Sequence, residues 1–275
     1  MYKVDYHIHS EFSGDSKENL EEIVKKSIEL GLNEIAITDH LEYDLLYIDW
    51  DKWTLDLDAY KIKVLSLQKK YKNNIIIKFG IEIGVQPETS KYLENIVDKY
   101  DFDFVIASNH SINKIDLASG LLQKGKSRYE VQNLYFETVL KNIETYNKFN
   151  VFGHLDFITR YGGPSFSGMD LNEHWEIIRK ILKLLISKGK GLEINTSGYR
   201  YKEDRVYPAF EILKEYFKLG GKIITIGSDA HIKEHIFMDI DKAYKILEEL
   251  GVKYITTFNK MKPEFKKIKE IKKLV

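Results

Sequence analysis

Short runs of apolar residues alternate with longer amphipathic segments along most of the chain. The short runs are apolar at successive positions, which is typical of strands covered by helices. The longer segments repeat their apolar residues with the period of a helix. The pattern predicts seven strands, at residues 2–9, 34–39, 75–82, 102–108, 151–155, 191–196 and 222–228. It predicts seven helices, at residues 18–31, 55–71, 88–99, 127–149, 171–188, 207–219 and 240–250.

Strands and helices in this alternation form a parallel sheet, because each helix returns the chain to the same edge. Seven such units predict an α/β barrel, and a doubly wound open sheet is the alternative, since periodicity does not show whether a sheet closes. In both folds the functional side chains lie at the carboxyl ends of the strands. We expect a single domain over residues 1–275, with residues 262–274 (KPEFKKIKEIKKL) as a solvated terminal helix.

Composition excludes several classes of protein. The 42 basic and 42 acidic side chains cancel, so the chain has no net field to attract a nucleic acid or an anionic membrane. The absence of cysteine excludes disulfides, thiolate metal sites and a cysteine nucleophile. The start, MYKVDYHIHS, does not resemble a signal peptide, and no apolar run is long enough to span a membrane. We expect a cytoplasmic protein that binds a small molecule; its oligomeric state is not predicted.

Six of the eight histidines lie at or close to the carboxyl end of a predicted strand. They occur in the segments HIH, TDH, SNH, GHLD and GSDAH, in which acidic residues accompany them. Residues two apart on a strand point to the same face, so His7 and His9 can reach one centre. The other two histidines, His174 and His235, are assigned to a helix surface or a loop.

Imidazole and carboxylate groups are ligands for zinc, manganese and iron. One histidine at a strand end is more often structural, but matched positions on six strands indicate a metal site. One ion takes three or four protein ligands, so this set indicates two or three divalent or trivalent ions, with Glu82 as a bridging carboxylate. The nine candidate ligands are His7, His9, Asp15, His40, Glu82, His110, His154, Asp229 and His231.

The segments HxH, TDH, GIE, SxH, GHLD and GSDAH, in that order, resemble the polymerase-and-histidinol-phosphatase (PHP) superfamily from residue 4 to about 235. The chain length and the segments GHLDFITRYG and EINTSGYR resemble its monofunctional histidinol-phosphate phosphatases. This resemblance implies a distorted (β/α)7 TIM-like barrel with three metals. It assigns the ligands as His7, His9, Glu82 and Asp229 for the first metal, Glu82, His110 and His154 for the second, and Asp15, His40 and His231 for the third. Some family members have histidine where this chain has Asp15.

Arginine is scarce, with five residues against 37 lysines. Arg160 and Arg200 follow predicted strands on the side of the histidines, where their planar side chains suit a phosphate. Arg205 lies in the same loop as Arg200 and could replace it. The alternative is that Arg160 and Arg200 form ordinary ion pairs with Asp156 or Glu203.

These features predict a metal-dependent phosphomonoesterase, a histidinol-phosphatase that releases L-histidinol and phosphate in histidine biosynthesis. A hydroxide shared by two metals would attack phosphorus while the metals and arginines neutralise the phosphoryl oxygens. The catalytic set is Glu82 as bridging ligand, with Asp229, His231 and Asp39 as candidates for the general acid.

The leaving group of this substrate is cationic, so its pocket needs a carboxylate or aromatic faces. Aromatic residues occur in two loops, although they could instead pack those loops onto the barrel. They are Tyr43, Tyr47, Trp50, Trp53, Tyr161 and Phe166.

Other functions fit parts of the pattern. A PHP-type hydrolase of another phosphoester, either a phosphotyrosine phosphatase or a nucleotide phosphodiesterase, would have the same metal ligands. A nuclease module is disfavoured by the neutral charge, and a non-catalytic metal-binding protein by the arginines. Residues 120–127 (GLLQKGKS) match the P-loop pattern, but a P-loop follows its strand directly, and about ten residues intervene here. Lys124 or Lys126 could still contact the substrate.

Overall fold

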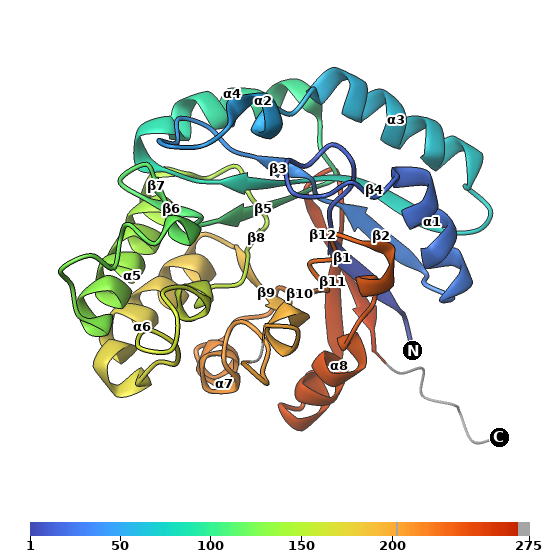
Figure 1. Cartoon of the computed structure of the whole chain (residues 1–275). Helices are drawn as coiled ribbons and strands as arrows, with labels where there is room; N and C mark the ends of the chain where they lie inside the picture. The colour runs from blue at the N-terminus through green and yellow to red at the C-terminus, as the bar shows by residue number, and fades with distance from the viewer. Residues whose placement is uncertain (202, 269–275) are drawn as a thin grey trace.

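The computed structural model describes residues 1–201 and 203–268. Seven parallel strands curl into a nearly closed barrel in the order β1-β2-β4-β5-β8-β9-β10 (Figure 1). These strands are β1 (Val4–Ile8), β2 (Glu34–Ile37), β4 (Ile76–Gly84), β5 (Phe104–Ser108), β8 (Val151–Phe152), β9 (Gly191–Asn195) and β10 (Ile224–Gly227). The short β3 (His40–Leu41) pairs with β4. The predicted TIM-like barrel is therefore confirmed over the open sheet.

The barrel closes between its first and last strands through few main-chain contacts. A single parallel bridge joins Ile8 to Ala230, and the amide of His9 donates to the carbonyl of Ala230 at 2.8 Å. The buried carboxylate of Asp5 adds to this seam by accepting from the amide of Ser228 at 2.9 Å and from its hydroxyl at 2.5 Å. The side chain of Asp5 thus supplies hydrogen bonds between β1 and β10, whereas main-chain hydrogen bonds join the other neighbouring strands of the barrel.

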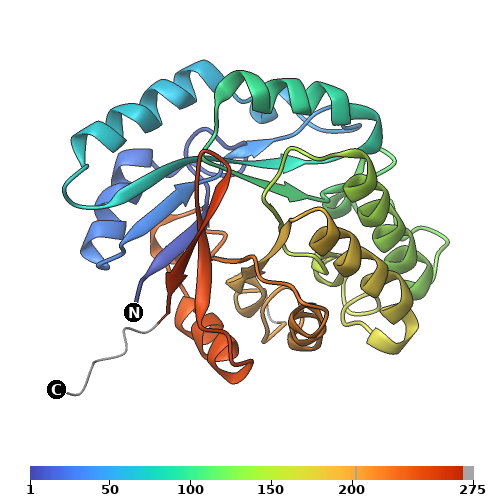
Figure 2. The same cartoon turned by 180° about the vertical axis from the view of Figure 1, so that it is seen from behind.

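Helices surround the barrel on its outside (Figures 1 and 2). They are α1 (Leu20–Glu29), α3 (Leu57–Lys70), α4 (Ser90–Tyr100), α5 (Arg128–Thr145), α6 (Leu171–Ser187), α7 (Phe210–Lys218) and α8 (Ile240–Glu249). Local sequence fixes their starts: the side chain of Asn19 caps α1, and Ser127 and Glu130 form a capping box on α5. Each of these helices buries apolar residues against the barrel or its neighbours.

Short elements occupy the connecting loops. They are α2 (Trp50–Trp53), the hairpin β6 (Ser111–Ile112) and β7 (Ile115–Asp116), and 3-10 turns at Pro87–Thr89, Leu117–Ser119, Phe157–Arg160, Thr196–Tyr199 and Lys233–His235. No helix in the described part of the chain is both long enough and apolar enough to cross a membrane.

The C-terminal region differs from its prediction. Residues 254–267 form an antiparallel hairpin of β11 (Tyr254–Asn259) and β12 (Lys262–Lys267), so the helix predicted from residue 262 is wrong there. Residues 269–274 of that prediction lie outside the described residues. Lys260 and Met261 form the tight turn with positive φ angles of 48° and 63°. The hairpin packs at the opposite end of the barrel from the histidines, where Phe258 stacks on Phe104 with 5.1 Å between ring centroids.

Two histidine-bearing segments also differ. The fifth strand ends at Phe152, so His154 lies beyond it, in a turn with a φ of 21°. His174 is buried on α6 rather than exposed, because its ring packs between Tyr129 and Phe136 of α5.

Candidate metal centre and active site

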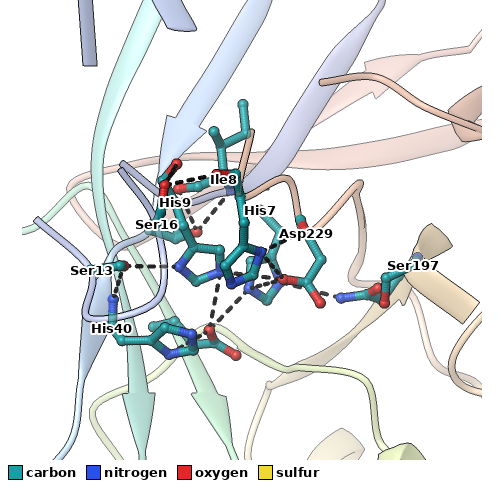
Figure 3. Close-up of polar contacts among 12 residues, drawn as sticks. His7, Ile8, His9, Ser13, Ser16, His40, Ser197 and Asp229 are labelled. Carbon is teal, nitrogen blue, oxygen red and sulfur yellow. Dashed lines mark hydrogen bonds and ion pairs between the residues drawn. The ribbon is translucent and has the colours of Figure 1, made fainter. Parts of the chain in front are cut away.

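All nine predicted ligands lie at the carboxyl ends of the barrel strands or in the loops that follow them. Figure 3 shows four of them, His7, His9, His40 and Asp229, pointing toward one another. His7 and His9 extend from β1 into the same space, as their spacing on the strand requires. Asp229 follows β10 in a left-handed turn with a φ of 55°.

Glu82 on β4 lies at the middle of the cluster. Its Oε1 atom is 2.9 Å from Nε2 of His154 and 3.3 Å from Nε2 of His110. Its Oε2 atom is 3.0 Å from Nε2 of His7 and 3.1 Å from Nδ1 of His40. One carboxylate therefore contacts two separate sets of imidazoles, which is the arrangement that a bridging ligand needs.

Four groups of side chains could each hold a metal ion, with ligand atoms within 4.8 Å of one another. The groups are His7, His9 and Glu82; Glu82, His110 and His154; His9, Asp15, His40 and His231; and His40, Glu42 and His110. The second group coincides with the set implied by the family resemblance. The first group lacks the implied Asp229, although its Oδ1 lies 3.3 Å from Nε2 of His9, and the third group includes His9 in addition.

The donor atoms fit divalent ions. Nδ1 of His9 contacts the hydroxyl of Ser13 at 3.1 Å, whereas its buried Nε2 has no hydrogen-bond partner among the described residues. Nδ1 of His40 is likewise buried without a hydrogen-bond partner there. Buried polar atoms normally have partners, so nitrogens that face carboxylates without one are suited to a metal.

Electrostatics in the cluster favour the exchange of protons for metal. Burial, together with the neighbouring His231 and His40, lowers the pKa of His9 to about 3, so its ring is neutral, as a metal ligand must be. Burial also lowers the pKa of His40, but Asp15 and Glu82 outweigh this and raise it to about 9. Burial alone would raise the pKa of Glu82, yet His7 and His40 hold it well below its usual range.

Two carboxylates that the sequence analysis missed lie behind the histidines. Oε1 of Glu193, on β9, is 2.5 Å from Nδ1 of His7. Oε1 of Glu42, which follows β3, is 2.5 Å from Nδ1 of His110. For Glu193 the available signal was an acidic residue within a buried apolar run, GLEIN, which is rare unless the charge is paired.

Asp39 has a different position from the one its proposed role requires. Its carboxylate is buried and accepts from the amide and hydroxyl of Ser10, at 2.6 and 2.7 Å, and from the hydroxyl of Ser13 at 2.8 Å. Asp39 therefore supports the loop after β1 and does not line the cavity. This position argues against Asp39 as the general acid.

A cavity of about 400 Å³ opens beside the cluster. Besides candidate ligands, it is lined by Glu42, Leu45, Ile48, Trp53, Asp116, Ala118, Phe157, Arg160, Tyr161 and Tyr201. Of the loop aromatics considered from sequence, Trp53 and Tyr161 line it. Tyr43 and Trp50 line a neighbouring hollow instead, and Tyr47 is exposed.

The three loop arginines have different environments. Arg160 lines the cavity, with its guanidinium 3.2 Å from the ring centroid of Tyr201. Arg200, also predicted to contact the phosphate, does not line the cavity: its Nη2 donates to the carbonyls of Ser228 and Asp229, and its buried Nη1 has no partner in the described part of the chain.

Arg205 is fully engaged elsewhere. Its guanidinium pairs with Asp156 at 2.7 Å and with Glu203 at 3.0 Å, so it cannot replace Arg200 at a phosphate. The P-loop-like segment is also structural, since Ser127 caps α5 and neither Lys124 nor Lys126 lines the cavity.

Comparisons with known proteins agree with this geometry. A histidinol-phosphatase of Lactococcus lactis is 37% identical over 266 residues, which cover 95% of this chain and 96% of that protein. A probable histidinol-phosphatase of Clostridium acetobutylicum is 34% identical and covers 90% of this chain and 94% of its own. The crystal structure of histidinol phosphate phosphatase from Lactococcus lactis, complexed with zinc, L-histidinol and phosphate, has a TM-score of 0.88 at 34% identity, covering 96% of this chain and 99% of that one.

The histidine and acidic segments on and after β1, β4, β5 and β9 lie in the part of the chain that matches a known protein family. The model for the PHP domain matches residues 5–197, and the relatives above match nearly the whole chain. A barrel with histidines and acids at its carboxyl end, matched over this length, places the chain in the PHP domain family.

Proposed function

We propose that this protein is a metal-dependent phosphomonoesterase that hydrolyses L-histidinol phosphate to L-histidinol and phosphate. The observation that carries the proposal is one cavity bounded by the histidine–carboxylate cluster, by Arg160, and by the carboxylates of Glu42 and Asp116. The names of the relatives, and the zinc, L-histidinol and phosphate in the Lactococcus lactis structure, support it. The proposal includes a single domain and the cytoplasmic, biosynthetic role expected from the family resemblance.

The nine predicted ligands would hold two or three ions of zinc, manganese or iron, since imidazole and carboxylate suit all three. Ions bound there would supply Lewis acidity to the phosphoryl oxygens and lower the pKa of a coordinated water. Glu82 would bridge two of them, because its two oxygens face different histidines. Neighbouring carboxylates fix ring orientation, so the protein contributes the geometry of the centre.

Arg160 would neutralise the phosphate. It faces the cavity and stacks on Tyr201, which limits the orientations of its planar side chain. A donor already fixed in place loses little conformational freedom when the substrate binds. Arg200 does not line the cavity, and its Nη2 donates to two carbonyls of the turn that carries Asp229, so it would act by holding that turn.

The carboxylates of Glu42 and Asp116 would bind the leaving alcohol, which carries an ammonium and an imidazole. Asp116 lines the cavity, and its Oδ1 accepts from the amide of Ala118 at 2.6 Å. A cationic group would therefore meet a carboxylate that is held in a fixed position. Of the three candidates for protonating the leaving oxygen, Asp229 and His231 line the cavity and Asp39 does not.

The test is the initial rate of phosphate release from L-histidinol phosphate, p-nitrophenyl phosphate, phosphotyrosine and bis-p-nitrophenyl phosphate. The full chain is reconstituted separately with zinc, manganese and iron. We expect kcat/KM for histidinol phosphate to exceed the others by at least about 100-fold. A substrate without the cationic leaving group would leave the polar groups of the site without partners, which weakens binding of the transition state. A flat profile would refute the substrate, and preference for the diester would indicate a phosphodiesterase.

The variant Asp116→Asn sharpens this test. It should lower kcat/KM for histidinol phosphate about 10-fold or more, because it removes one charge-assisted hydrogen bond. Rates on p-nitrophenyl phosphate should change little, because its leaving group carries no cation. Equal losses on both substrates would show that Asp116 does not recognise the leaving group.

A further inference from the structure

Behind the metal centre lies a carboxylate that the proposed chemistry does not use. Glu193 on β9 is 0% exposed and does not line the cavity. Its Oε1 is 2.5 Å from Nδ1 of His7. Its Oε2 accepts from the backbone amide of His154 at 3.0 Å and from the side chain of Asn195 at 3.2 Å. One buried side chain thus connects β1, β9 and the turn after β8.

The contact with His7 determines which ring nitrogen is available. An ionised carboxylate only accepts hydrogen bonds, so in the neutral ring Nδ1 carries the hydrogen and Nε2 keeps its lone pair. Nε2 is the atom that faces the cluster, 3.0 Å from Oε2 of Glu82. Glu193 therefore orients His7 as a ligand without approaching the substrate.

The backbone around Glu193 is shaped to accommodate it. A Cβ atom at Gly227 would lie 2.3 Å from Cβ of His7 and 2.7 Å from Oε1 of Glu193. A Cβ atom at Gly153 would lie 2.6 Å from the hydroxyl of Ser108 and 3.4 Å from Oε2 of Glu193. The glycines that begin the GSDAH and GHLD segments leave the space that this glutamate and its partners occupy.

We infer that Glu193 is a positioning residue that fixes the tautomer of His7 and the turn carrying His154, and that it thereby sets the metal affinity of the centre. Outer carboxylates of metal-bound histidines act in this way. The inference rests on the proposed function only in requiring that the cluster bind metal, whatever the substrate.

The experiment measures zinc affinity of the purified full-length protein by competition with a chelator. Glu193→Gln should weaken zinc binding about 10–100-fold, because the amide can present a donor to Nδ1 of His7. Glu34→Gln is the matched control, since Glu34 is also buried but accepts from the hydroxyls of Tyr2 and Tyr6, at 2.7 and 2.5 Å. It should change zinc affinity less than about twofold, because its partners lie outside the centre.

Kinetics provide a second readout. At limiting zinc, Glu193→Gln should lower the apparent kcat while KM for histidinol phosphate stays within about threefold, because a smaller fraction of the protein holds zinc and the loaded fraction keeps its substrate contacts. A folded Glu193→Gln protein with wild-type zinc affinity would overturn the inference.

Glu193→Asp tests the same point if the glutamine variant does not fold. The shorter carboxylate keeps the charge but not the reach, so zinc affinity should still fall, and wild-type affinity would again overturn the inference. A wild-type protein that binds zinc without hydrolysing histidinol phosphate would refute the proposed function alone, because zinc affinity would still decide the role of Glu193.

Discussion

Two parts of the metal centre differ in how firmly the protein holds them. The floor group comprises His7, Glu82 and His154. The rim group comprises Asp15, His40 and His231. The floor side chains are at most 2% exposed, whereas Asp15 and His231 are 33% and 26% exposed. Within the floor group a buried carboxylate contacts Nδ1 of His7. Among the described residues, the ring nitrogens of His231 contact only Asp15 and the backbone or side chain of Asp229.

This difference indicates that the floor is preorganised and the rim adapts. Asp15 and His231 come from loops and His40 from the two-residue strand β3, and small hydroxyl groups support the rim: Ser13 accepts from the amide of His40, and Ser16 donates to the carbonyl of His231. Exposed charges interact more weakly than buried ones. We therefore expect a rim ion to bind more weakly than floor ions and to be the first removed by a chelator.

The largest effect should come from Glu82→Gln, because the amide cannot bridge two ions. Outer partners alone cost about 10–100-fold, so loss of the bridging ligand should lower kcat/KM on the order of 10³-fold or more. Metal content measured by mass spectrometry should fall with it. A Glu82→Gln protein with full metal content and full activity would refute the bridging role and remove the distinction between floor and rim.

Asp15→Ala should affect only the rim. The protein should lose one equivalent of metal and keep the rest, with activity lower by about 10–100-fold, which is the cost of disturbing a ligand environment. Asp15→His is the control, because it restores a ligand at the same position. Loss of all metal in Asp15→Ala would show that floor and rim form one cooperative unit.

The pH dependence of metal binding should distinguish the two groups further. Because Asp15 and Glu82 outweigh burial and raise the pKa of His40 to about 9, a rim ion must displace a proton at neutral pH. Rim affinity should therefore rise with pH, by up to about tenfold per unit, and level off near pH 9. In Asp15→Ala the pKa of His40 should fall and the slope should become shallower. A slope unchanged by this substitution, in competition titrations from about pH 6.5 to 9, would exclude His40 as its source.

The smallest effect concerns Trp53, whose ring lies edge-on to His40 with 5.5 Å between centroids. Trp53→Ala should weaken rim binding about 2–10-fold, since such ring contacts contribute about 0.5–1.5 kcal/mol. Trp50→Ala is the control, because Trp50 lines the neighbouring hollow and not the cavity. Equal changes in both variants would show that the loop, and not the ring contact, supports His40.

The sequence predicted the barrel well because its strands are buried on both sides and stand out as apolar runs. The nine candidate ligands could be found because they follow those strands directly, and the structure places them together; their role as ligands stays a prediction. Glu193 was missed because it acts through a residue 186 positions away, and no local spacing records such a contact. Arg200 and Arg205 could not be separated for the same reason, since their partners lie on other elements.

Local patterns misled in two places. His174 occupies a position on an amphipathic helix that its polar side chain would place at the surface. It faces α5 instead, where its ring contacts Gln132. The lysines of residues 262–267 resemble a solvated helix, but lysine is equally suited to an exposed edge strand, which it protects from further pairing. In both cases the neighbouring element decided the structure.

The seam between β10 and β1 has a consequence for biogenesis. The ribosome delivers Asp229 and His231 more than 200 residues after His7. Until β10 emerges, Asp5 lacks the Ser228 partner that joins the two strands. The nascent chain therefore carries an open, half-built centre, and the barrel closes only after β10 has emerged. Ions captured at that moment would stabilise the closed form by mass action, so that metal loading acts as the last step of assembly.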